Sequence, residues 1–132
     1  QLQGSLPPEW SAMTNIESFY LGKNKLTGPL HAEYGNWSKI RDLRLYENQL
    51  HGILPEDWSE MAELETLYLH SNLLTGSLPP AWGSLNKLQQ LFVEDNILTG
   101  TLPSELGALT EVEALLLNTN SFTGAIPYEW AQ

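Results

Sequence analysis

Residues 64–87 read L-E-T-L-Y-L-H-S-N-L-L-T-G-S-L-P-P-A-W-G-S-L-N-K, and this stretch of 24 residues decides the fold. The pattern recurs along the whole chain without an insertion, and its asparagine marks the period most clearly. That asparagine recurs every 24 residues, at Asn24, Asn48, Asn72, Asn96 and Asn120. A fixed period of this length is typical of repeat proteins whose units stack on one another. We therefore expect residues 1–132 to form a single domain of five repeats and a partial sixth.

Each repeat carries two apolar positions separated by one residue, a local period of two that predicts a short strand. These pairs are Phe19/Leu21, Leu43/Leu45, Leu67/Leu69, Leu91/Val93 and Leu115/Leu117. One strand per repeat, always in the same chain direction, gives a parallel sheet with one strand per coil. After each asparagine follows an L-x-G-x-L/I-P step, in which proline disfavours a long helix opposite the sheet. The second repeat has His31 where proline is expected.

We call a set of positions 24 residues apart a column. The columns of this chain resemble those of the leucine-rich repeat family over its entire length, and the L-x-G-x-L/I-P half resembles the plant-specific class of that family. The resemblance implies an α/β-type, right-handed curved solenoid with a parallel sheet on the concave side. It also implies a mostly irregular or short 3-10 convex side and a second short strand near the L-x-G step. One column departs from the usual leucine, with Trp10, Tyr34, Trp58, Trp82 and Trp130 against a single Leu106. In that column the repeats are similar to those of trypanosomatid surface antigens and proteophosphoglycans.

Several repeated columns have a structural explanation. A tight turn after each strand leaves backbone groups that need partners, and a stacked asparagine can satisfy them. The tryptophan column recurs in nearly every coil, so we expect it to pack in the core rather than to form a binding platform. The column beside it is expected in the core for the same reason, and contains Met13, Trp37, Met61, Leu85 and Leu109.

Composition narrows the class of partner. Sixteen acids against six bases give a formal net charge of −10, which disfavours nucleic acid and anionic lipid headgroups. No apolar run is long enough to cross a membrane, so we expect no direct membrane insertion of this segment. There is no cysteine, which excludes disulfides and thiolate sites. The bases are concentrated in one stretch, which contains Lys23, Lys25, Lys39, Arg41 and Arg44.

Catalytic and metal sites are not predicted. The histidines His31, His51 and His70 occupy different columns, so they lack the spacing of metal ligands. Stacking would place His70 between Tyr46 and Glu94, with Ser71 beside it. A serine, a histidine and an acid in proximity resemble the triad of a hydrolase, but an open sheet offers no oxyanion hole. We therefore expect no enzyme, no metal and no cofactor.

One N-x-S/T sequence, Asn36-Trp37-Ser38, makes Asn36 a candidate for N-glycosylation on the convex side of the second repeat.

The candidate binding residues occupy the outward columns of the predicted strands. Stacked coils lie about 4.8 Å apart, so Tyr68, Phe92 and Leu116 would form a contiguous apolar stripe. Aromatic side chains with a polar rim are the usual composition of a protein-binding hot spot. The predicted ligand-binding residues are Tyr20, Arg44, Tyr46, Tyr68, His70, Phe92, Glu94 and Leu116.

The sequence thus favours a module that binds a protein or peptide ligand through its concave face, in a cell-surface or secreted protein. The alternative is a structural repeat stalk or surface-coat antigen segment without a dedicated ligand. Neither end has a capping segment, so we expect a fragment that can self-associate through its uncapped ends.

Overall fold

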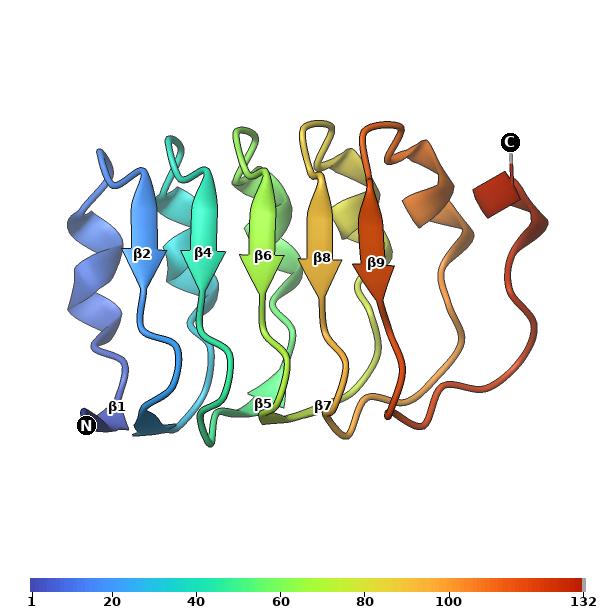
Figure 1. Cartoon of the computed structure of the whole chain (residues 1–132). Helices are drawn as coiled ribbons and strands as arrows, with labels where there is room; N and C mark the ends of the chain where they lie inside the picture. Colours follow the sequence, from blue (N-terminus) through green and yellow to red (C-terminus); the bar gives the residue numbers. More distant parts are fainter. Residues whose placement is uncertain (132) are drawn as a thin grey trace.

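The computed structural model describes residues 1–131 as a stack of similar coils, with the sheet in front and short 3-10 helices behind it (Figure 1). The main sheet has five parallel strands in the order β2-β4-β6-β8-β9. Its members are β2 (Ser18–Tyr20), β4 (Asp42–Arg44), β6 (Thr66–Tyr68), β8 (Gln90–Phe92) and β9 (Ala114–Leu116). Each strand pairs with the strand of the next coil, as the period predicts.

The second half of each coil is irregular apart from short segments. At the lower edge in Figure 1, β1 (Gln3–Ser5) pairs with β3 (Lys25–Thr27), and β5 (His51–Ile53) pairs with β7 (Leu73–Thr75). Both pairs lie at the L-x-G step, where the resemblance implied a second strand. The 3-10 helices are η1 (Pro8–Ala12), η2 (Ala32–Asn36), η3 (Glu56–Glu60), η4 (Pro80–Ser84), η5 (Ser104–Ala108) and η6 (Tyr128–Ala131). None of the helices in residues 1–131 has the length and apolarity to cross a membrane.

The core lies between the sheet and the 3-10 helices. Leu43, Leu67 and Leu91 are paired in register across the sheet and are fully buried. The tryptophans of the central coils, Trp58 and Trp82, close the core from behind and are also fully buried. This confirms the assignment of the leucine and tryptophan columns to the inside of the solenoid.

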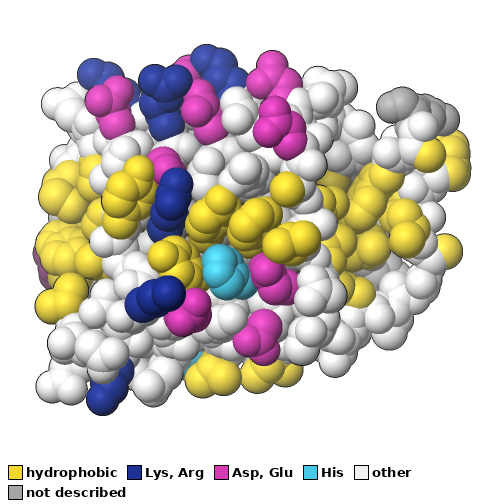
Figure 2. All heavy atoms as spheres, viewed as in Figure 1, with side chains coloured by type: hydrophobic (Ala, Val, Ile, Leu, Met, Phe, Trp, Pro, Cys, Tyr) yellow, Lys and Arg dark blue, Asp and Glu magenta, His cyan; other side chains and the backbone are white. Residues whose placement is uncertain are grey.

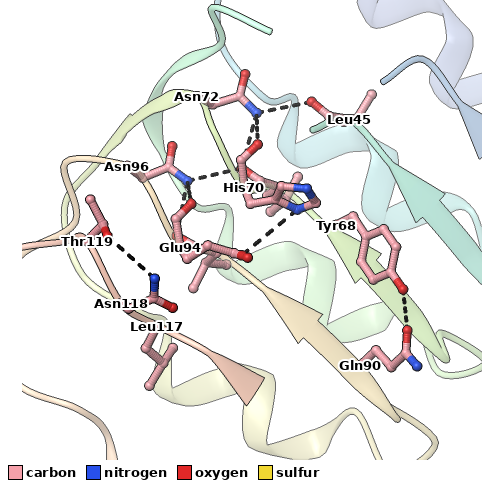
Figure 3. A network of polar contacts seen from close by, with 12 residues as sticks. Leu45, Tyr68, His70, Asn72, Gln90, Glu94, Asn96, Leu117, Asn118 and Thr119 are labelled. Carbon is pink, nitrogen blue, oxygen red and sulfur yellow. Dashed lines mark hydrogen bonds and ion pairs between the residues drawn. The ribbon is translucent and has the colours of Figure 1, made fainter. Parts of the chain in front are cut away.

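The asparagine column forms a hydrogen-bonded ladder between coils. The Oδ1 atom of Asn72 accepts a hydrogen bond of 3.0 Å from the Leu50 N–H of the preceding coil. Its Nδ2 atom donates to the carbonyl of Leu45, also in the preceding coil, and to those of Leu69 and His70 in its own (Figure 3). One amide thus satisfies four backbone groups, which confirms the structural role predicted for this column.

The aromatic column forms a second ladder behind the sheet. The indole N–H of Trp58 donates to the carbonyl of His31, 27 residues earlier, at 2.8 Å. Trp82 makes the same contact with Pro55, and the hydroxyl of Tyr34 donates to Pro7 at 2.7 Å. The acceptor is in each case the residue that precedes a 3-10 helix, so the column joins successive coils as well as filling the core.

One core residue was predicted wrongly. Met13 has 41% of its surface exposed, whereas Met61 of the same column is fully buried. Met61 is covered by coils on both sides. Met13 belongs to the first coil and has a neighbouring coil on one side only.

We expect Trp58→Ala to lower the free energy of unfolding by about 3–5 kcal/mol, because it empties a buried aromatic site and removes an inter-coil hydrogen bond. Chemical denaturation measures the loss. Leu2→Ala is the control, since 55% of the Leu2 surface is exposed, and its effect should stay within about 1 kcal/mol. Similar losses in both variants would contradict the assignment of the tryptophan column to the core.

Alkaline pH should also destabilise the fold through Tyr34. Burial, with smaller contributions from Glu9 and Glu33, raises the pKa of Tyr34 from 10.0 to about 12. Between these two values the unfolded chain releases the proton and the folded chain keeps it, so the free energy of unfolding falls as pH rises.

Urea denaturation from pH 8 to 12 should show a shallower alkaline decline in Tyr34→Phe than in the native chain. The variant also loses the hydrogen bond to Pro7, so the slopes rather than the absolute stabilities are compared. Tyr128→Phe, at a position that is 73% exposed, should retain the native slope. An unchanged slope in Tyr34→Phe would assign the decline to other groups.

Candidate functional site

The outward side chains of the main sheet form a continuous row, which we call the aromatic ladder. Residues at the ends of the five strands are paired in register, so their side chains stand next to one another on the concave face. The aromatic ladder consists of Tyr20, Arg44, Tyr68, Phe92 and Leu116. This face, which we call the sheet face, also carries the other predicted ligand-binding residues.

The centre of the aromatic ladder is a stacked pair of rings. The ring centroids of Tyr68 and Phe92 lie 4.4 Å apart, and their planes differ by only 5°. The hydroxyl of Tyr68 donates a hydrogen bond to the side-chain oxygen of Gln90 (Figure 3). Both rings are half-buried, because each covers part of the other.

Arg44 lies between two tyrosine rings rather than free in solvent. Its guanidinium carbon is 5.0 Å from the ring centroids of both Tyr20 and Tyr68. Two nitrogens of the guanidinium donate to the carboxylate of Asp42, each at 2.8 Å, and the Tyr20 hydroxyl donates to the same carboxylate at 2.9 Å. The hydrogen bonds from Arg44 to Asp42 raise the pKa of Arg44 above its usual value.

Arg44 is thus a paired charge rather than a free one, although its side chain is still 37% exposed. Asp42 neutralises the guanidinium, and the tyrosines shield its two faces. Arg44 is therefore an element of the aromatic ladder, and the basic character of this end of the sheet face is weaker than the sequence suggests.

A second column runs beside the aromatic ladder through Tyr46, His70 and Glu94. The rings of Tyr46 and His70 are stacked, with centroids 4.8 Å apart and planes 7° apart. Gly22 makes room for this stack, since a Cβ atom there would come within 2.6 Å of the Tyr46 ring. On the other side of His70, its Nδ1 atom lies 3.9 Å from Oε1 of Glu94.

The two columns meet to form one surface. The ring of His70 lies 5.7 Å from that of Tyr68 and 5.9 Å from that of Phe92, centroid to centroid. Figure 2 shows the result as a band of apolar side chains across the sheet face, with basic, histidine and acidic groups beside it. The ends of the band are most open, with Tyr20 58% and Leu116 37% exposed.

Asn36, the predicted glycosylation site, lies apart from this surface. It is exposed at the end of η2, behind the main sheet (Figure 1). Its modification remains a prediction.

Three residues of the site were missed by sequence reasoning, namely Gly22, Asp42 and Gln90. Asp42 and Gln90 stand two residues before Arg44 and Phe92 on the same strands, and alternate residues of a strand share a face. A search of that column could have found both. Gly22 has no side chain to attract notice, and its role depends on the direction taken by the Tyr46 ring.

The two ionisable side chains of the second column lie near each other without a hydrogen bond. Nδ1 of His70 and Oε1 of Glu94 are 3.9 Å apart, which exceeds the length of a hydrogen bond. Within residues 1–131, no group of three or more His, Asp or Glu side chains is placed to hold a metal ion. What the site does present is stacked rings, a clamped guanidinium and carboxylates.

We expect Tyr68→Ala to lower the free energy of unfolding by about 1–3 kcal/mol, because it removes both the stack on Phe92 and the contact with Arg44. Chemical denaturation measures the change, and Tyr128→Ala, at an exposed tyrosine, should alter stability by less than about 0.5 kcal/mol. If the two variants lost equal stability, the contacts within the aromatic ladder would make no measurable contribution to the free energy of unfolding.

Comparison with known proteins supports the repeat assignment. The family model described as Leucine Rich Repeat matches residues 63–85 and 87–109. Comparison with curated proteins gives no significant match.

Solved structures are similar over nearly the whole chain. The ectodomain of the plant membrane receptor kinase GASSHO1/SCHENGEN3 from Arabidopsis thaliana, solved with CASPARIAN STRIP INTEGRITY FACTOR 2, has a TM-score of 0.95 and 34% identity over 96% of this chain. The plant peptide hormone receptor RGFR1, solved with RGF2, has a TM-score of 0.97 and 32% identity over 98%. A plant ice-binding protein has a TM-score of 0.92 and 29% identity over 98%.

The chain spans only 15%, 21% and 42% of these three proteins, respectively. The similarity therefore concerns a run of repeats and not a whole receptor. From its 24-residue columns, its two inter-coil ladders and these matches, we conclude that the chain belongs to the leucine-rich repeat family.

Proposed function

We propose that the sheet face binds an extended peptide or protein segment, and that the chain is a recognition module of a cell-surface or secreted protein. The observation that carries this proposal is the aromatic ladder. Solubility alone would place polar side chains at these outward positions, whereas the protein places Tyr20, Tyr68, Phe92 and Leu116 there.

The composition of the surface supports this proposal. Tyrosine and arginine are enriched at interface hot spots, and a polar rim commonly surrounds them. The aromatic ladder crosses five coils, or about 19 Å at a spacing of about 4.8 Å. An extended peptide of about six residues covers that length.

The similar structures support a ligand-binding role for these repeats. GASSHO1/SCHENGEN3 and RGFR1 are receptors that were solved with a bound partner, and the first is described as an ectodomain of a membrane receptor. This analogy supports an extracellular location and a binding role for the module. A glycan at Asn36 would leave the sheet face free, because Asn36 lies on the opposite side.

A structural stalk is the alternative, and it needs only the framework. Leucines, asparagines and tryptophans supply the buried part of that framework. The similarity to a plant ice-binding protein underlines that the framework alone does not decide function. The clamped Arg44 and the stacked rings favour recognition, since a stalk has no need of them.

Phe92→Ala should weaken binding of the natural partner by about 1–4 kcal/mol, as truncation of a hot-spot residue does. The partner is recovered by pull-down from the extracellular fraction, and its affinity for the immobilised chain is then measured. Circular dichroism checks that the variant remains folded.

The controls are Glu56→Ala and Glu105→Ala, which change exposed acids of η3 and η5 behind the sheet. Both should bind like the native chain. A loss in these controls together with unchanged binding by Phe92→Ala would move the site to the convex side.

A further inference from the structure

Two acids of the sheet face, Glu94 and Asp95, are not balanced by the chain's own bases. Arg44 is bound to Asp42, whereas Glu94 and Asp95, which follow β8, have no comparable partner. Within residues 1–131, Asp95 forms no ion pair, and the ion-pair contact of Glu94 is the long one with His70. The other side chains beside these acids in the adjacent coils are uncharged, namely Ser71, Asn118 and Thr119.

The Glu94 carboxylate is also short of hydrogen bonds. Its side chain is only 19% exposed, and its buried Oε1 atom accepts no hydrogen bond from any residue in the described range. The Nδ1 atom of His70, which faces it in Figure 3, is buried and unpartnered as well. A carboxylate that has lost hydration and lacks a counter-charge raises the free energy of the unbound protein. A cation brought by a partner to the exposed part of this side chain would supply the carboxylate with a counter-charge.

The protein itself shows how this surface holds a cation. The guanidinium of Arg44 rests between two rings and is bound by one carboxylate. Similar components are found near Glu94. The ring of His70, in the adjacent coil, lies beside the carboxylate, and the ring of Phe92, two residues before Glu94 in the chain, lies 5.9 Å from the His70 ring. A carboxylate next to aromatic rings is the chemistry that binds ammonium and guanidinium groups.

We propose that the occupant of the sheet face is an extended peptide that presents an arginine or lysine side chain to Glu94 and Asp95. This inference rests on the proposed function and deepens it by naming the class of ligand. Alternate side chains of an extended peptide face the same way, so an apolar residue two positions along rests on Phe92 and Leu116. An acidic peptide is disfavoured, because the one guanidinium of the sheet face is already neutralised and the chain carries a net charge of −10.

The test uses the full 132-residue chain and a display library of random linear heptapeptides. The library is panned against the native chain, and recovered peptides are then measured on E94Q/D95N and on E56Q/D57N. Both variants neutralise a Glu-Asp pair, but the second pair is exposed on η3, behind the sheet. The matched change in net charge separates a local contact from the general field of the protein.

We expect the recovered peptides to be enriched in arginine or lysine next to apolar residues. Their affinity should fall about tenfold or more on E94Q/D95N, as expected for the loss of a charge-assisted hydrogen bond. It should remain close to native on E56Q/D57N. Asparagine tolerates the left-handed backbone of position 95, where φ is 57°, so D95N should not disturb the turn.

A second arm removes the charge from the peptide. The tightest peptide is synthesised with blocked ends, and its arginine is replaced by citrulline or its lysine by acetyl-lysine. Binding to the native chain should fall by a similar factor of about ten, while binding to E94Q/D95N should change little, since the interaction is already absent there.

The outcomes separate the two proposals. If no peptide is enriched, or if enriched peptides bind Phe92→Ala as tightly as the native chain, the proposed function fails. If binding depends on Phe92 but is equal on native and E94Q/D95N chains, the sheet face binds peptides and the cationic assignment is wrong. Equal losses of peptide affinity on E94Q/D95N and E56Q/D57N would also overturn the cationic assignment, because binding would then depend only on the net charge of the protein.

Discussion

The side-chain amide of the repeated asparagine is the interaction on which the rest of this structure depends. Each strand ends in a turn whose residue has a positive φ, as at Ser71 and Asp95, and the asparagine follows directly. The turn leaves backbone groups of two coils without partners, and the amide of Asn72 satisfies four of them at once. Loss of one amide would therefore leave buried groups such as the Leu50 N–H unsatisfied, which costs about 1–3 kcal/mol for each such group.

The asparagine ladder fixes the register between coils, and the register decides which side chains become neighbours. Residues 24 positions apart lie side by side across the sheet, so Arg44 stands next to Tyr68 and Tyr68 next to Phe92. Behind the sheet, the indole of Trp58 reaches a carbonyl of the preceding coil in the same repeating way. The asparagine ladder joins neighbouring coils just after the strands, and the tryptophan column joins them at the start of the 3-10 helices. Neighbouring coils are therefore fixed to each other at two separate places.

The period of the sequence was sufficient to predict the framework, because a column that points inward in one coil points inward in the next. The asparagine and tryptophan roles followed from the same reasoning and are confirmed. The argument failed at Met13, since it assumes a neighbour on both sides. The period also could not predict the contacts of Arg44. These contacts depend on the conformations that long side chains adopt across the surface, and the repeat of the backbone does not determine those conformations. Asp42 is the residue that holds Arg44 in place, and it lies outside the two columns in which the ligand site was sought.

The framework is shared with plant receptors and with a plant ice-binding protein, so any difference in function has to come from the outward columns. In this chain those columns are ordered before any partner arrives. Arg44 is held by Asp42 and two rings, Tyr68 is stacked on Phe92, and Tyr46 is stacked on His70. Side chains that are already immobilised lose little conformational entropy on binding, so the ordering cost falls mainly on the ligand. Glu94 and His70 are the exception, because a buried polar atom of each side chain lacks a hydrogen-bond partner, and it is on this deficit that the proposed cationic ligand rests.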